Sequence, residues 1–134
     1  MRIKSLEYLS FTDEQLSVFR ILFSLFFLFF NGMPLHDEIS RLPQEFLTYP
    51  SVALLYGSFP PLAFFQFMDI AMATAVVFTL IGFYTRVAAI LAFAFSIISY
   101  SFAFSVGGSS SLFLIPFFFI ILSFSGWGSH YSLD

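Results

Sequence analysis

Long apolar runs almost free of charge are the feature that most restricts how this chain folds. A helix that crosses a bilayer needs about 20 mainly apolar residues, and four segments meet or approach that length. They cover residues 16–35, 62–83, 87–106 and 112–127. Strands are excluded because an open sheet edge leaves backbone groups unsatisfied in hydrocarbon. The sequence therefore predicts an all-α integral membrane protein with a single transmembrane domain over residues 1–134.

The composition of the chain indicates that lipid is its main solvent. Hydrophobic residues make up 59% of the chain and charged residues 10%, against about 25% charged in ordinary soluble domains. The 23 phenylalanines are too many for the interior of a small water-soluble globule. A net charge of -3 without a basic stripe argues against a nucleic-acid partner. The absence of cysteine excludes disulfides, thiolate nucleophiles and cysteine-based metal sites.

The segments between the apolar runs predict how the helices connect. Thr12 and Gln15 have capping-box spacing before the first helix. The turn "GFYTR" (residues 82–86) is so short that the second and third helices must be antiparallel neighbours. Pro116 lies inside the fourth run and predicts a kink there. The polar stretch between the first two helices interleaves charged and apolar residues, so the fold prediction is a four-helix transmembrane bundle with an interfacial amphipathic loop.

Positive residues near the helix ends predict the orientation of the chain. Arg2, Lys4 and Arg86 fall on one side of the predicted bundle, and Arg41 falls on the other. Cytoplasmic loops carry the excess of Lys and Arg, so both termini are predicted to be cytoplasmic. The N-terminus is polar for too long to be a cleaved signal peptide, and we expect the first membrane helix to carry the targeting information.

Two charged residues lie within predicted membrane helices. Arg20 is about 6 Å inside the cytoplasmic boundary at 1.5 Å per residue, and helical side chains lean toward their own N-terminus. We therefore expect Arg20 to reach the headgroups as an anchor, with a pair to a neighbouring helix or carbonyl as the alternative. Asp69 lies about 12 Å from the outer surface and leans the other way. It is predicted to meet His36, Arg41 or water rather than Arg20.

Asp69 and His36 are the candidate functional residues. An intramembrane carboxylate is a functional-site hypothesis by default, and a protonated or hydrogen-bonded structural role is the alternative. His36 precedes Asp37 and Glu38, but adjacent residues point to different sides of a helix and do not easily converge on one metal ion. His130 is a lone histidine beside the interface aromatics. The sequence predicts no catalytic residue and no metal site, and it indicates no particular cofactor.

Small residues predict which helices pack most closely, because lipid gives no hydrophobic drive between helices. The third helix carries one stripe of small residues, namely Ala88, Ala92, Ser96, Ser99 and Ala103. The second helix offers Ala71 and Ala75 in the same manner. We expect the second and third helices to pack against each other through this stripe. The alternative is that the stripe forms a dimer interface. Trp127 is an expected anchor at the cytoplasmic interface.

Several short motifs, in order, resemble one membrane family. They are "SVFRILFSLFFLF" in the first helix, "GFYTR" after the second, a Ser-rich entry to the fourth, and "HYSLD" at residues 130–134. They are similar to motifs of the horizontally transferred transmembrane domain, the superfamily of vitamin K-dependent gamma-carboxylase. The resemblance covers about residues 12–134 and implies the first four helices of a longer membrane domain. Arg20 and Arg86 match the motifs, and the resemblance makes them architectural.

Departures from the family argue against an enzymatic role for this chain. The family's catalytic base is a lysine on a later segment that has no counterpart here, and "GGSSS" replaces its histidine at the entry to the fourth helix. The leading prediction is a non-catalytic or accessory subunit packed against other membrane protein subunits. One alternative is the N-terminal part of a carboxylase-like membrane enzyme. Another is a proton- or quinone-linked carrier subunit that uses Asp69.

Overall fold

The computed structural model of the chain contains only helices in the part that it describes. That part is residues 12–29, 41, 43, 60–105, 114–125 and 133, apart from the side chains of 103–105. The helices are α1 (Asp13–Phe29), α2 (Leu62–Ile81), α3 (Thr85–Ser105) and α4 (Phe117–Ser123). The predicted all-α fold is confirmed for these residues. The predicted interfacial loop lies almost entirely outside them.

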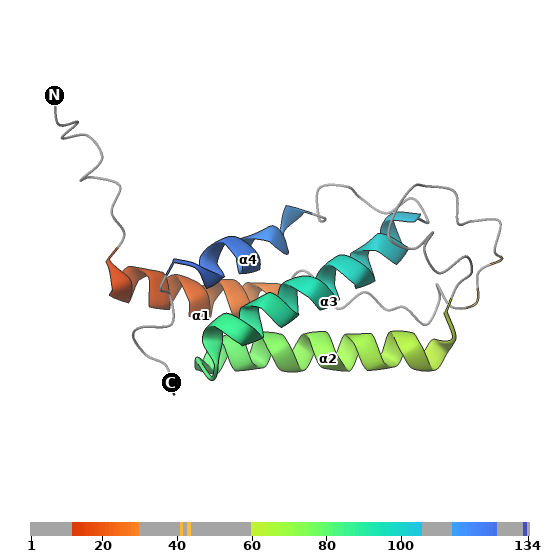
Figure 1. Ribbon diagram of the computed structural model, residues 1–134, viewed down its shortest axis with the longest axis horizontal. Coiled ribbons are helices and arrows are strands. Elements are labelled where there is room, and N and C mark those ends of the chain that lie inside the picture. Colours follow the sequence, from red (N-terminus) through yellow and green to blue (C-terminus); the bar gives the residue numbers. More distant parts are fainter. Residues whose placement is uncertain are drawn as a thin grey trace, which may run out of the picture.

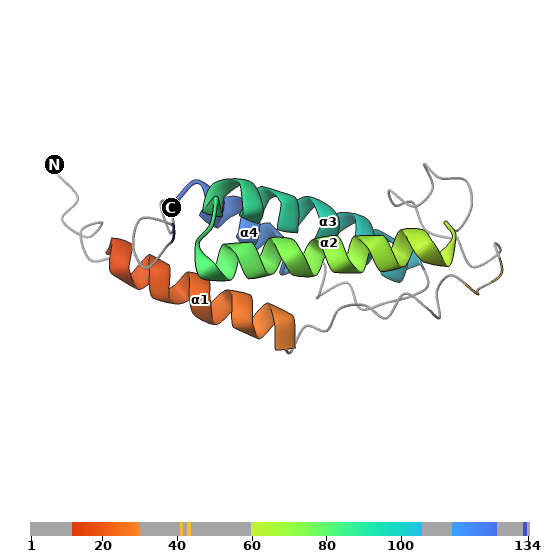
Figure 2. The ribbon, with the colours of Figure 1, turned by 90° about the horizontal axis from the view of Figure 1, so that it is seen from below.

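The four helices alternate in direction (Figures 1 and 2). α1 and α3 run one way and α2 and α4 run the other, so the start of α1 lies at the same end as the turn between α2 and α3. The contact between α2 and α3 is the largest between these helices, ahead of α3 with α4 and α1 with α2. α1 and α4 meet through aromatic rings: Phe119 lies 4.9 Å from Phe23 and 5.1 Å from Phe27, centroid to centroid.

α1 begins with the capping box that its sequence predicts. The backbone N–H of Thr12 donates to Oε1 of Gln15 at 3.0 Å, and the backbone N–H of Gln15 donates to Oγ1 of Thr12 at 3.3 Å. Two of the backbone N–H groups at this end therefore have partners. The helix starts three residues earlier than predicted, and residues 30–35 of the prediction lie outside the described part.

α2 and α3 form an antiparallel hairpin around a short turn, as predicted. α2 ends at Ile81 and α3 begins at Thr85. Arg86 therefore belongs to the first turn of α3 rather than to the connection. The rings of Phe65 and Phe102, near the far ends of the two helices, lie 5.2 Å apart. The helices thus stay together over most of their length.

Pro116 immediately precedes α4. Residues 112 and 113 of the predicted fourth helix lie outside the described part, so the predicted kink stays a prediction. Pro116 is the N-cap residue, with φ -57° and ψ -28°, and α4 runs from Phe117. The residues just before it, Leu114 and Ile115, form a tight turn. Proline has no N–H to give to the preceding turn, and its fixed φ suits the start of a helix. The predicted span over residues 112–127 is therefore a shorter helix in the described range.

Polarity is reversed between the interior and the surface of the bundle. On α1, Ser17, Arg20 and Ser24 are each 0% exposed, whereas Leu22 and Phe29 are 60% and 77% exposed. Apolar side chains also fill the centre, which contains Phe27, Met72, Ala75, Val76, Ala89, Ala92, Tyr100 and Phe119. α2 and α3 are long and apolar enough to cross a membrane. The described helices thus expose many large apolar side chains.

Candidate functional site

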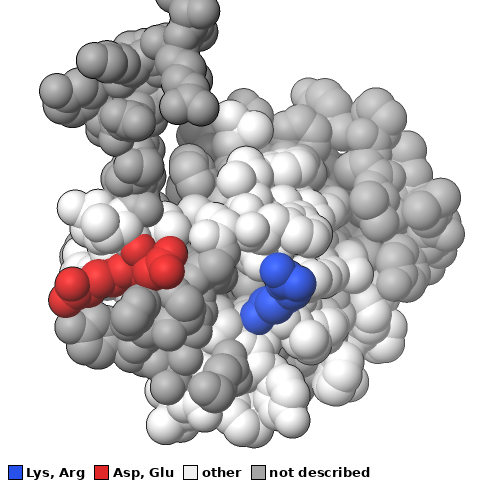
Figure 3. All heavy atoms as spheres, turned by 60° about the vertical axis from the view of Figure 1, so that its left-hand side comes forward, with Lys and Arg blue, Asp and Glu red and all other residues white. Residues whose placement is uncertain are grey.

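Five of the nine buried polar or charged side chains in the described part lie toward the end of the bundle where α1 starts, α2 ends, α3 starts and α4 ends. Figure 1 shows this end of the bundle. We call this region the polar end. Its buried polar residues are Ser17, Arg20, Thr79, Thr85 and Ser123. Each of them lies within two turns of a helix terminus at this end. Figure 3 looks onto the polar end and shows adjoining acidic side chains and, apart from them, a basic side chain.

Three hydroxyls of the polar end donate to backbone carbonyls of their own helices. Ser17 Oγ donates to the carbonyl of Asp13 at 2.9 Å, and Thr79 Oγ1 donates to that of Ala75 at 2.9 Å. Ser123 Oγ likewise donates to the carbonyl of Ile120 at 2.7 Å. A hydroxyl bonded in this way is buried without an unsatisfied donor. These residues therefore provide small, satisfied surfaces against which neighbouring helices pack.

Arg20 lies inside the bundle, which corrects the expectation that it reaches the headgroups. Its side chain is 0% exposed. Ser17, Ser24 and Phe27 share its helix face at spacings of three, four and seven residues, and all are buried. The guanidinium is therefore buried with that face of α1 instead of reaching outward to the headgroups. The lean of helical side chains toward the N-terminus predicts a direction along α1, but it does not predict which face of α1 meets the other helices.

The turn between α2 and α3 has a defined C-capping geometry. Gly82 has φ 75°, and its N–H donates to the carbonyl of Thr79 at 3.3 Å, while the N–H of Phe83 donates to that of Phe78 at 2.9 Å. This is the hydrogen-bond pattern of a Schellman motif. The rings of Phe78 and Phe83 lie 5.6 Å apart and supply its hydrophobic contact. The turn is thus fixed by backbone bonds and by one aromatic pair.

Two of the motifs that carry the family resemblance meet at this turn. The backbone N–H of Leu133, in "HYSLD", donates to the carbonyl of Gly82, in "GFYTR", at 3.1 Å. Leu133 also lines a hollow of about 530 Å³ together with Tyr84, Arg86 and Val87. Residues far apart in sequence are therefore joined at the polar end. The sequence gives no signal for this contact, because the bond uses backbone atoms only.

Arg86 joins the start of α3 to the end of α4. Its Nε donates to the backbone carbonyl of Ser123 at 3.2 Å, and its guanidinium carbon lies 5.8 Å from the centre of the Phe124 ring. The last carbonyls of a helix have no partner within the helix, and a cation there also suits the helix dipole. Arg86 therefore holds two helix ends together, whereas Arg20 is buried among the helices.

The small-residue stripe of α3 lies largely inside the protein. Ala88, Ala92, Ser96 and Ser99 are all buried, and the side chain of Ala103 lies outside the described part. Ala75 on α2 is buried as well, and Ala71 is half-buried. Ala75 and Ala92 belong to the same core cluster. The stripe thus lies on the side of α3 that takes part in the largest helix contact.

Asp69 is half-buried in the first half of α2. The antiparallel course of α1 and α2 places it toward the end where α2 begins, whereas Arg20 lies toward the end where α2 finishes. His36, Trp127 and His130 lie outside the described residues. Among the residues that are described, no group of three His, Cys, Asp or Glu side chains forms a metal site. The predicted contact between Asp69 and His36 therefore lies outside the described part of the chain.

The sequence did not predict three buried hydroxyls that are possible polar sites. Ser24 Oγ, Ser96 Oγ and Tyr100 Oη have no hydrogen-bond partner in the part of the chain that the structure describes. For Ser24 a signal existed, because Ser17, Arg20 and Ser24 repeat at helical spacing along one face. Ser96 was assigned to packing alone. Tyr100 carried no signal, since an aromatic within a Phe-rich helix is ordinary core.

Comparison with known proteins does not extend these findings. No known protein family, curated protein or solved structure matches this chain. The resemblance to the horizontally transferred transmembrane domain stays a prediction.

Proposed function

We propose that this chain is a multi-pass membrane protein that serves as an accessory subunit and packs against other membrane proteins. The reversed polarity of the bundle carries the proposal. A charged side chain is rarely buried completely in a soluble protein, yet Arg20 is, while large apolar residues such as Phe67 and Ile70 are 63% and 68% exposed. Lipid is the solvent in which such a surface is stable.

The burial of α2 and α3 supports the membrane part of the proposal. Only 33% of the apolar window of α2 is buried, and 50% of that of α3. The core helix of a soluble protein would be covered on nearly all sides. Monomeric soluble proteins also rarely expose continuous apolar patches beyond a few hundred Å². These faces therefore contact lipid or other membrane helices.

The outward face of α2 supports the subunit part of the proposal. Gln66, Ile70, Thr74 and Val77 follow one another at helical spacing and are all exposed. We call them the Gln66 face. The hydroxyl of Thr74 donates to the carbonyl of Ile70 at 2.8 Å, but the amide of Gln66 faces outward. Polar side chains hydrogen-bond across helices in membranes, and an amide in hydrocarbon is unfavourable without a partner. The Gln66 face is thus the proposed contact with another subunit.

Photo-crosslinking in cells tests this proposal. A photoreactive amino acid at position 66 should give a protein adduct of discrete mass that mass spectrometry identifies as a membrane protein. The same photoreactive amino acid at position 25, on the exposed face of α1, is the matched control. It should give lipid adducts only. Gln66→Leu should reduce the protein adduct formed from position 70. Lipid adducts alone from both positions would rule out a subunit contact on this face.

The proposed orientation, with both termini in the cytoplasm, is tested by labelling. The chain contains no cysteine, so each single-cysteine variant carries one reactive thiol. Cysteine in place of Ser51 should react with a membrane-impermeant maleimide on intact cells. Cysteine in place of Ser5 should react only after the membrane is permeabilised. The opposite labelling pattern would reverse the orientation, and labelling of a soluble fraction would remove the membrane assignment altogether.

A further inference from the structure

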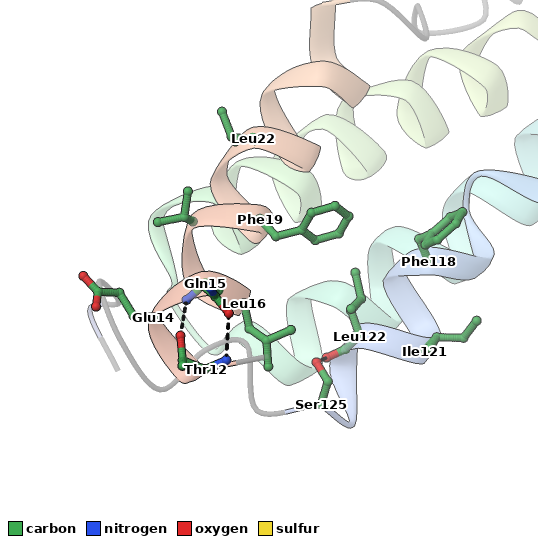
Figure 4. A pocket seen from close by; sticks show the side chains of 11 residues that line it. Thr12, Glu14, Gln15, Leu16, Phe19, Leu22, Phe118, Ile121, Leu122 and Ser125 are labelled. Atoms are coloured by element: carbon green, nitrogen blue, oxygen red, sulfur yellow. Dashed lines mark hydrogen bonds between the residues drawn. The ribbon is translucent and has the colours of Figure 1, made fainter. Parts of the chain in front are cut away.

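We draw no further inference here: the strongest candidate, the open apolar groove that Phe19 of α1 and Phe118 of α4 line at the polar end (Figure 4), carries none, because nothing in the described part of the structure shows what covers it.

Discussion

The side chain of Arg86 bridges two helix ends, with its Nε 3.2 Å from the backbone oxygen of Ser123 and its guanidinium over the ring of Phe124. α4 has only seven residues, Phe117–Ser123, and follows a proline. So short a helix is not stable by itself, and it depends on packing and on contacts of this kind. The bridge therefore contributes to holding α4 against α3.

Removing this bridge should loosen α4. Arg86→Gln is expected to lower the free energy of unfolding in detergent by about 1 kcal/mol, because a charge-assisted bond at an exposed position is weakened by solvent. Arg86→Lys should recover little, since lysine lacks the planar guanidinium that both bonds and stacks. Phe124→Leu keeps the hydrogen bond but removes the aromatic ring, so its effect measures what the ring contact adds to stability. Thermal denaturation followed by circular dichroism measures all three, and a fully stable Arg86→Gln would contradict the bridge.

Enlarging a small residue at the contact between α2 and α3 should destabilise the bundle. Ala92 is 0% exposed and belongs to the core cluster with Met72 and Val76. Ala92→Leu is expected to overfill this contact and to lower stability by about 1–3 kcal/mol. Ala63→Leu is the matched control, because Ala63 is exposed on α2. Equal melting temperatures for the two variants would show that the stripe is not a tight contact.

Gly82, at the end of α2, has a left-handed backbone conformation and should tolerate few substitutions. Gly82 has φ 75°, a conformation that a side chain with Cβ disfavours by about 1–2 kcal/mol. Gly82→Ala is therefore expected to lower stability by that amount. Gly82→Asn should lose less, because asparagine visits this region more readily. The order of melting temperatures, Gly above Asn above Ala, checks the assignment, and an Ala variant as stable as the parent chain would contradict it.

Local signals in the sequence were sufficient for the parts of the fold that depend on a few neighbouring residues. Thr12 and Gln15 predicted the capping box, and the short "GFYTR" turn predicted the α2–α3 hairpin. Pro116 predicted a kink in the fourth helix, although proline also fits the start of a helix. The packing of α4 involves α1 and α3, which such local signals do not reach.

Long-range contacts explain why the site was harder to predict than the fold. Arg86 and Ser123 are 37 residues apart, and the acceptor is a backbone oxygen that any residue would supply. The direction of Arg20 depends on which face of α1 meets the other helices. The serines at positions 17 and 24 indicate that face in retrospect, because small polar residues are frequent where membrane helices pack. The ring contacts between α1 and α4 likewise depend on the relative placement of both helices.

The burial of Arg20 changes what its replacement should do. Buried charged groups are paired or hydrogen-bonded, and lysine presents a different donor geometry from the guanidinium. Arg20→Lys is therefore expected to lower stability by about 1–3 kcal/mol, whereas an anchor at the headgroups would accept lysine with little loss. Asp69→Asn should be tolerated for folding, because a neutral amide is less unfavourable in hydrocarbon than a carboxylate. Melting temperatures in detergent compare the two variants directly.

A double-mutant cycle on the same two residues tests whether they form a pair. Asp69 lies about 18 Å along α2 from the polar end and Arg20 about 10 Å along α1 from its start, at 1.5 Å per residue. Because α1 and α2 are antiparallel, we expect Arg20→Gln and Asp69→Asn to act independently. Their effects on stability should add within about 0.5 kcal/mol. A coupling energy above roughly 1.5 kcal/mol would show a direct pair, whereas additive effects leave Asp69 as the residue to test for proton chemistry.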